Sequence, residues 1–170
     1  MSMCGNDCVE DLRKFLDGFC FTVLHHVLPV ASDRTSHWDL LLEHPDLEPE
    51  KVLCFEVFTP PSMWSSPTKL VRLPNHRRIY LTYEGPISGD RGQVSLVLTG
   101  KLVWLPPLTG LLQAKILSLA SKNKNLSLIK NGLDQTPMIS LSQQSKDPVQ
   151  LLDLNSAPGT NESWTLATTP

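Results

Sequence analysis

The sequence predicts a mainly β protein, a small β-barrel with short helical flanks and a disordered C-terminal tail. Residues 37–43 (HWDLLLE) alternate so that His37, Asp39 and Glu43 share one face of a strand. Short apolar stretches recur between clusters of turn residues, which is typical of small barrels and sandwiches. Beyond about residue 110 the chain becomes rich in Ser, Asn, Lys, Gln, Thr and Pro, and Trp164 is its one aromatic residue.

The length and charge of the chain narrow the classes of protein that it can be. A chain of 170 residues is long enough for one domain with a core, plus tails. Fifteen Lys and Arg against 17 Asp and Glu give a net charge of −2, so any site for a polyanion must be local. Without eighteen consecutive apolar residues or a signal-peptide pattern, we expect an intracellular, soluble protein with no membrane partner.

Four cysteines, Cys4, Cys8, Cys20 and Cys54, are too few and too irregularly spaced for a disulfide framework. We therefore expect free thiols. Cys4 and Cys8 could be half of a zinc site, but no second pair of Cys or His residues stands at a matching spacing.

The first half of the chain reads as strands separated by turns. Residues 1–18 form a polar N-terminal segment in which 11–15 could be a short helix, and an apolar strand begins after Gly18. A proline-containing turn follows the strand 37–43, and His44 in this turn is expected to be solvated. The expected strands are 19–24, 37–43 and 51–58, and residues 59–68 form an irregular connection.

The second half begins with another strand, residues 76–84 (HRRIYLTYE), which places His76, Arg78, Tyr80 and Glu84 on one face. A glycine-rich turn over 85–92 precedes a hairpin in which 93–98 and 101–105 flank Thr99 and Gly100. The barrel domain is expected to span 19–110, with a helical segment within 111–133. Residues 134–170 hold too few apolar residues to offset chain entropy, so we expect disorder there.

Three blocks of this sequence, in order, resemble the N-terminal 3′-phosphoesterase domain of bacterial DNA ligase D and its stand-alone relatives. The first is residues 21–26 (FTVLHH), in which His26 matches the family histidine. The second is residues 37–43, with its His-Trp-Asp and Leu-Glu pairs. The third is residues 75–87, in which Tyr80 follows His76 at a spacing of four and the motif Tyr83-Glu84-Gly85 comes next. The resemblance covers about residues 19–105.

The resemblance implies a β-barrel with a groove, and repair of nucleic-acid 3′ ends by removal of a 3′-phosphate or a 3′-terminal ribonucleotide. It implies a divalent metal, Mn²⁺ or another ion such as Zn²⁺, held by His26, His37 and Asp39. His76 and Tyr80 would contact the scissile phosphate. A ligase or polymerase acting in trans would use the resulting 3′-hydroxyl. These residue types suit the chemistry, since two imidazoles and one carboxylate leave open positions on the ion.

The chain departs from the family pattern in three places. Leu41 stands where the family has an arginine, so we expect Arg78, or else Arg91, to supply the cation for the phosphate. The stretch between His26 and His37 is about five residues longer than in the family pattern, which leaves His25 as an alternative ligand.

The third departure is a shortened region after Gly92, which predicts a missing hairpin, an opened barrel and exposed strand edges. Two alternatives to the enzyme follow. The barrel could be inactive and bind nucleic-acid ends or a protein partner. Without the resemblance, His37 and Asp39 would read as the polar face of a half-solvated sheet.

Overall fold

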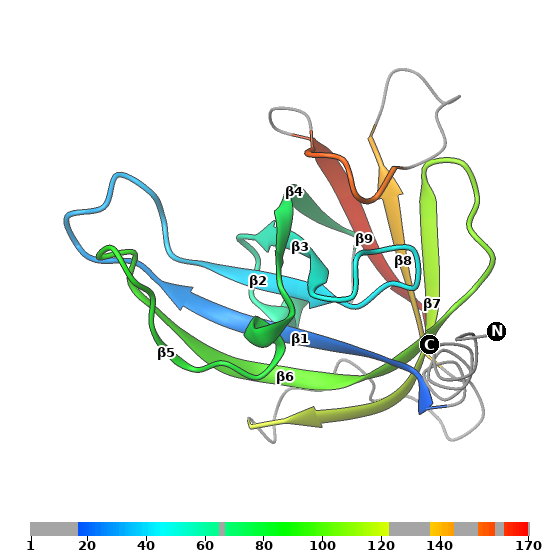
Figure 1. The fold of residues 1–170 in the computed structure, drawn as a ribbon, viewed down its shortest axis with the longest axis horizontal. Coiled ribbons are helices and arrows are strands. Elements are labelled where there is room, and N and C mark those ends of the chain that lie inside the picture. The colour runs from blue at the N-terminus through cyan, green and yellow to red at the C-terminus, as the bar shows by residue number, and fades with distance from the viewer. Residues whose placement is uncertain (1–16, 65–66, 123–136, 145–152, 159–161, 170) are drawn as a thin grey trace, which may run out of the picture.

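Nine antiparallel strands make up the fold in a computed structural model, which describes residues 17–64, 67–122, 137–144, 153–158 and 162–169 (Figure 1). Two short 3-10 helices, η1 (Pro61–Met63) and η2 (Arg78–Leu81), interrupt the strands. The strands are β1 (Phe19–Val27), β2 (His37–Leu42), β3 (Lys51–Val57), β4 (Thr68–Arg77), β5 (Gly85–Pro86), β6 (Gln93–Trp104), β7 (Leu111–Ser121), β8 (Met138–Gln143) and β9 (Ser163–Thr169).

Eight of these strands close into a barrel. Their order is β1-β2-β3-β4-β9-β8-β7-β6, and β6 pairs back onto β1, while β5 lies outside the barrel against β6. The predicted β-barrel is therefore confirmed. The expectation that a missing hairpin opens it is wrong, because β1 and β6 pair from Phe19 opposite Leu102 to Val27 opposite Gln93.

The predicted helix within 111–133 is wrong over residues 111–121, which form β7. Leu112, Ala114 and Ile116 are buried and alternate with less buried neighbours, which is the period of a strand rather than of a helix. The predicted disorder over 134–170 is wrong for β8 and β9, and the barrel extends well past residue 110. Trp164 and Leu166 of β9 lie in the core.

The predicted hairpin around Thr99 and Gly100 is also wrong, because β6 runs through both residues as one strand. A Cβ on Gly100 would lie 2.2 Å from the carbonyl oxygen of Ser118 and 2.6 Å from the ring of Phe21. This glycine therefore serves close packing inside the sheet rather than a turn.

The predicted strand 76–84 ends at Arg77, and the chain continues as η2. The hydroxyl of Thr22 on β1 donates a hydrogen bond of 2.8 Å to the carbonyl oxygen of Leu81, and Leu81 is itself buried. These two contacts fix η2 against the sheet. Because η2 is helical, Arg78 does not share a strand face with His76 and Tyr80.

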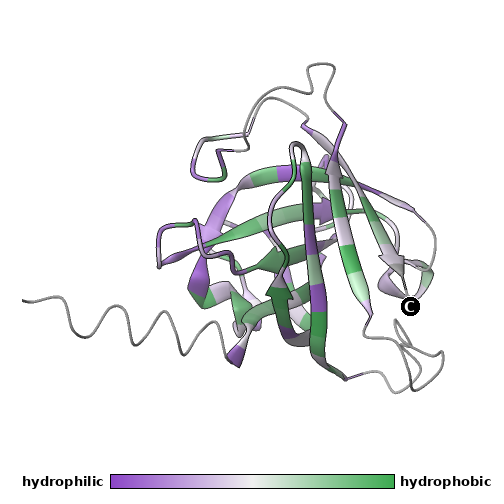
Figure 2. Cartoon of the chain, turned by 90° about the vertical axis from the view of Figure 1, so that its right-hand side faces the viewer, coloured by the Kyte–Doolittle hydropathy of each residue, from purple (hydrophilic) through white to green (hydrophobic). Residues whose placement is uncertain are grey.

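Buried apolar side chains form two clusters. Hydrophobic residues, green in Figure 2, recur along the strands. The larger cluster fills the barrel and includes Phe21, Phe55 and Trp164. The second cluster lies on the outer face, under η2 and β5; its buried members are Leu24, Leu41, Val52, Cys54, Leu81 and Val94. The outer face of β1 to β4 is thus a second structured surface, and the predicted site residues lie on it.

Several smaller predictions can be compared with the structure. Cys20 and Cys54 are free thiols, as predicted. Cys4, Cys8 and the short helix at 11–15 fall outside the described residues. His44 is not solvated, because its side chain is only 5% exposed and its ring lies 4.7 Å from that of Trp104. Among the described residues, no helix has the length and apolar character needed to span a membrane.

Candidate metal centre

Strand register brings His26, His37 and Asp39 together. In the β1–β2 pair His26 lies opposite His37, and Leu24 lies opposite Asp39, so the three polar side chains share the outer face. Nδ1 of His26 lies 3.4 Å from Oδ2 of Asp39, and Nε2 of His37 lies 3.4 Å from Oδ1. The three residues predicted as metal ligands are therefore neighbours in space.

The second nitrogen of each imidazole is bonded to a main-chain carbonyl. Nε2 of His26 donates to the oxygen of Arg91 at 2.7 Å, and Nδ1 of His37 donates to the oxygen of Thr35 at 2.8 Å. Since a carbonyl oxygen only accepts, each ring carries its proton on that side when it is neutral. The lone pairs of His26 Nδ1 and His37 Nε2 then face Asp39.

This arrangement fits a divalent ion. Oδ1 of Asp39 is buried and accepts no hydrogen bond from the described residues, which is costly unless another partner approaches it. The candidate ligand atoms of His26, His37 and Asp39 all lie within 4.8 Å of one another. Two ligands about 2.1 Å from a shared ion are themselves about 3.0 to 3.4 Å apart. Each histidine nitrogen lies 3.4 Å from one oxygen of Asp39, which agrees, and the wider separations of up to 4.8 Å within the cluster would shorten when an ion binds.

The charges within the cluster favour an ionised carboxylate. Burial opposes ionisation of Asp39, but its interactions with the imidazole rings of His26 and His37, when these rings are protonated, outweigh burial and lower the pKa of Asp39 to about 2. Burial likewise opposes protonation of His37, whereas Asp39, the Thr35 carbonyl and Glu56 favour it, and the net effect raises the pKa of His37. Asp39 is therefore an anion at neutral pH, the form that binds a metal.

Glu56 and Arg34 are site residues that the sequence analysis missed. Asp39 lies opposite Glu56 in the β2–β3 pair, and Oε1 of Glu56 is 3.4 Å from Nδ1 of His37. Nη2 of Arg34, from the loop before β2, lies 2.5 Å from the same oxygen. Glu56 is the one charge inside the apolar run 52–57, a signal that could have identified it.

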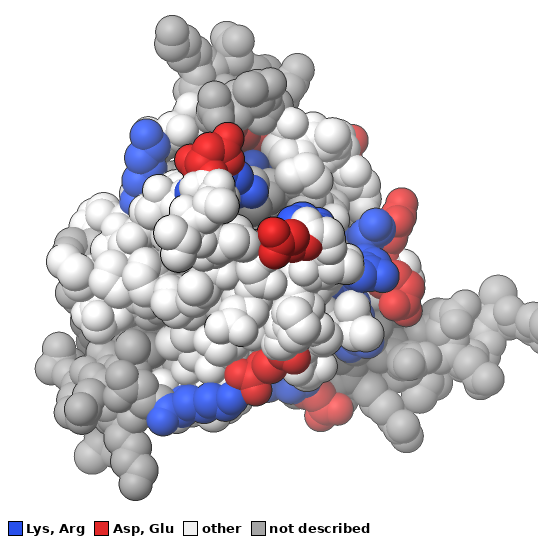
Figure 3. Space-filling model, turned by 90° about the vertical axis from the view of Figure 1, so that its left-hand side faces the viewer, with Lys and Arg blue, Asp and Glu red and all other residues white. Residues whose placement is uncertain are grey.

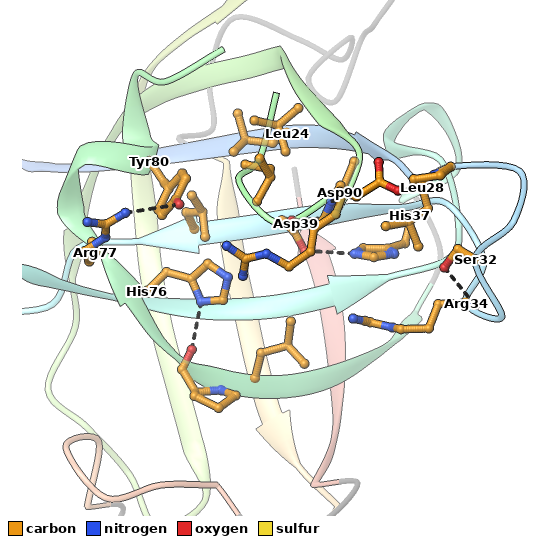
Figure 4. Close-up of a pocket in the computed structure, with 18 of the residues that line it drawn as sticks. Leu24, Leu28, Ser32, Arg34, His37, Asp39, His76, Arg77, Tyr80 and Asp90 are labelled. Carbon is orange, nitrogen blue, oxygen red and sulfur yellow. Dashed lines mark hydrogen bonds and ion pairs between the residues drawn. The ribbon is translucent and has the colours of Figure 1, made fainter. Parts of the chain in front are cut away.

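A cavity of about 600 Å³ opens over this cluster (Figure 4). The predicted residues His76 and Tyr80 line it together with the cluster, and their rings are 6.0 Å apart. Nδ1 of His76 donates a hydrogen bond of 2.9 Å to the main-chain oxygen of Pro74. The other ring nitrogen, Nε2, takes no part in this bond. Arg77, which the sequence analysis also passed over, lines the cavity too.

The structure places Arg78 elsewhere. Its Nε lies 2.5 Å from Oε1 of Glu43, and it does not line the cavity. Glu43 also accepts a hydrogen bond of 2.7 Å from the main-chain nitrogen of Cys20, so it orients no ligand histidine. Arg91, the other candidate cation, does line the cavity, where its Nε donates to the oxygen of Ser88 at 2.7 Å.

The structure also shows where His25 and Leu41 lie relative to the cluster. The ring of His25 stacks on Trp38 at 4.9 Å, away from the cluster, so His25 does not replace His26 as a candidate ligand. Leu41 lines the cavity and is fully buried, so an apolar side chain stands beside the cluster.

Fold and site together define the class of this molecule as a closed antiparallel β-barrel with a His₂Asp cluster under a cavity on its outer face. Comparison of the sequence with known protein families and with curated proteins finds no match. One face of the surface carries separate basic and acidic groups with wide uncharged areas between them (Figure 3).

Proposed function

We propose that this protein is a divalent-metal-dependent phosphoesterase that acts on nucleic-acid 3′ ends in DNA repair, removing a 3′-phosphate or a 3′-terminal ribonucleotide. The observation that carries the proposal is the convergence of two imidazole lone pairs and a buried carboxylate beneath a cavity that also holds His76, Tyr80 and arginines. The resemblance to the ligase D domain supplies the nucleic-acid 3′ end as substrate.

His26, His37 and Asp39 would hold Mn²⁺ or another divalent ion such as Zn²⁺. When bound, the ion would polarise a phosphoryl oxygen and activate water. The chain contributes the orientation of the ligands, because the Arg91 and Thr35 carbonyls fix the two rings.

His76 and Tyr80 would act on the substrate itself. Water adds to phosphorus as the bond to the 3′ oxygen breaks, which yields a 3′-hydroxyl and inorganic phosphate. Nδ1 of His76 donates to the Pro74 carbonyl, which orients the ring, so His76 would give the leaving 3′ oxygen its proton from Nε2 in the doubly protonated form of the ring. The Tyr80 hydroxyl accepts from Nη2 of Arg77 at 3.3 Å, so its own proton is free for a phosphate oxygen.

Arg91 takes the place of Arg78 as the cation for the scissile phosphate in this proposal. It lines the cavity, and it forms no ion pair with any residue that the structure describes. Its carbonyl holds His26, so the same residue orients a ligand and offers positive charge. The 3′-hydroxyl that results is the substrate of a ligase or polymerase acting in trans.

The test is release of phosphate from a primer-template duplex bearing a 3′-phosphate, in the presence of Mn²⁺. Wild type should release phosphate, His37→Ala should not, and His25→Ala should behave as wild type because its ring lies away from the cluster. No release from folded, metal-loaded wild type would refute the enzyme. It would favour the alternative, an inactive barrel that binds nucleic-acid ends or a protein partner. The buried Leu41 beside the cluster supports that alternative, because it stands where the family has an arginine.

A further inference from the structure

Arg77 differs from the other arginines of the cavity wall that come near the cluster. Arg34 is ion-paired with Glu56, and Arg91 is tied to the cluster through its carbonyl. Arg77, like Arg91, has no carboxylate partner among the described residues, and it is part of the cavity wall without being bonded to a residue of the cluster. Its positive charge is therefore available to a ligand.

Arg77 is held in place by an aromatic side chain rather than by an acid. Its guanidinium carbon lies 5.5 Å from the centroid of the Tyr80 ring, and its Nη2 donates to the Tyr80 hydroxyl. Tyr80 in turn packs edge to face on His76 at 6.0 Å and on Tyr83 at 5.7 Å. A cation fixed in this way loses little freedom when it binds an anion.

The cavity separates Arg77 from the metal cluster. Figure 4 shows Arg77 and Tyr80 at one end of the cavity and His37 with Arg34 at the other, with His76 between them. A phosphate at the cluster therefore leaves Arg77 facing another part of the same ligand. A nucleic-acid strand offers a phosphate at every nucleotide, and a guanidinium binds phosphate oxygens in pairs.

We propose that Arg77, whose guanidinium is held against the Tyr80 ring, forms a second phosphate subsite, which binds the internal phosphodiester next to the scissile 3′ group, while the Tyr80 hydroxyl keeps its place at the scissile phosphate. This inference rests on the proposed function and narrows its substrate class. The preferred substrate is a strand end with at least two phosphates, and an isolated 3′-phosphorylated nucleoside is a poor one. Apolar wall residues, among them Leu73 and Ile87, suit the carbon surface of the sugar or base between the phosphates.

The experiment compares thymidine 3′-monophosphate with a thymidine dinucleotide that also carries a 3′-phosphate, in Mn²⁺. Wild type should show kcat/KM about tenfold or more higher for the dinucleotide, mainly through KM, as one charged hydrogen-bonded contact allows. Arg77→Ala should bring the ratio of the two kcat/KM values to about one, and Arg77→Lys should retain part of it. Arg78→Ala is the matched control, because Arg78 is adjacent in sequence but paired with Glu43; it should keep the full ratio.

The other outcomes separate failure of the subsite from failure of the phosphoesterase activity. Phosphate release without preference in wild type, or a preference that survives in Arg77→Ala, overturns the subsite and leaves the phosphoesterase standing. No release from either ligand overturns the phosphoesterase. The subsite is then judged by calorimetric Kd values: it stands if wild type binds the dinucleotide about tenfold tighter and Arg77→Ala does not, and it falls otherwise.

Discussion

The main-chain oxygen of Arg91 lies 2.7 Å from Nε2 of His26, although 65 positions separate the two residues in the chain. This hydrogen bond fixes which nitrogen of His26 can face Asp39. The loop over residues 87–92 therefore supports the candidate metal centre with its backbone while Arg91 lines the cavity.

Gly92→Ala should weaken Mn²⁺ binding by about ten to a hundredfold, as the loss of a group that orients a ligand does. Gly92 has φ of 82°, and an added Cβ would lie 2.0 Å from the carbonyl oxygen of Val27. The loop must shift, and the Arg91 carbonyl shifts with it. Titration calorimetry with Mn²⁺ measures the effect.

Gly89→Ala is the control for this change. Gly89 also has positive φ, 78°, but its added Cβ would meet nothing closer than Nε of Arg91 at 3.9 Å. It should cost about 1 kcal/mol of backbone strain and leave the Mn²⁺ affinity near that of wild type. Equal losses of affinity in both variants would show that the Arg91 contact is not what matters.

Asp39→Asn should reduce Mn²⁺ affinity by at least about a hundredfold, because it removes the one anionic ligand of the cluster. Circular dichroism should show that the barrel remains folded. In wild type, saturating Mn²⁺ should raise the melting temperature, and a chelator should reverse the rise. A metal-induced rise that persists in Asp39→Asn would place the ion elsewhere.

Glu56→Gln should weaken Mn²⁺ binding by about tenfold, because it removes the charge beside Nδ1 of His37. Glu43→Gln is a matched comparison, since Glu43 is also a partly buried carboxylate paired with an arginine, but outside the cavity. Its Mn²⁺ affinity should stay at the wild-type value. If calorimetry gives the same affinity for both variants, Glu56 has no part in orienting His37.

Trp164→Ala should lower the free energy of unfolding by about 3 to 5 kcal/mol. The Trp164 ring is fully buried and packs edge to face on Phe55 at 5.4 Å. Urea denaturation measures the loss, with Met63→Ala as control, since Met63 is 59% exposed and should change stability by less than about 0.5 kcal/mol. A small effect of Trp164→Ala would mean that β9 adds little to the barrel.

His44 should make the protein less stable in acid. Burial lowers the pKa of His44 from 6.5 to about 4, against the opposing charge of Asp46. Between these pH values the unfolded chain binds a proton that the folded protein does not, so stability falls as the pH falls through this window. The loss is at most roughly 3 kcal/mol.

His44→Gln isolates this effect from other titrating groups, because Gln cannot be protonated in the window. The difference in free energy of unfolding between wild type and variant should shift by that amount from pH 6.5 to pH 4. Parallel pH profiles for the two proteins would show that His44 titrates alike in both states.

Sequence patterns predicted strands correctly where the residues are clearly apolar or clearly polar on each face. Alternation and apolar runs located β1, β2 and β3, and placed His37 and Asp39 on one face. They could not supply the register that sets His26 opposite His37, because pairing depends on the whole sheet. Arg34 and Arg77 were missed for the same reason, since the cavity gathers them from separate segments.

The C-terminal strands were missed because composition was averaged over long windows. A barrel strand needs only one apolar face, and in β8 Ile139 and Leu141 supply it among polar neighbours. Arg78 was misplaced because two arginines stand at the end of β4, and the change from strand to η2 after Arg77 turns Arg78 toward Glu43.

The pairing of β4 with β9 has a consequence for biosynthesis. Thr68 lies opposite Leu166, so this edge of β4 meets its neighbour only after nearly a hundred further residues have been made. Until then the edge of β4 over residues 68–71 is open to pairing with other chains. Folding of the barrel should therefore be slow and should finish only after β9 has been made, and a chaperone that shields open edges should increase the soluble yield.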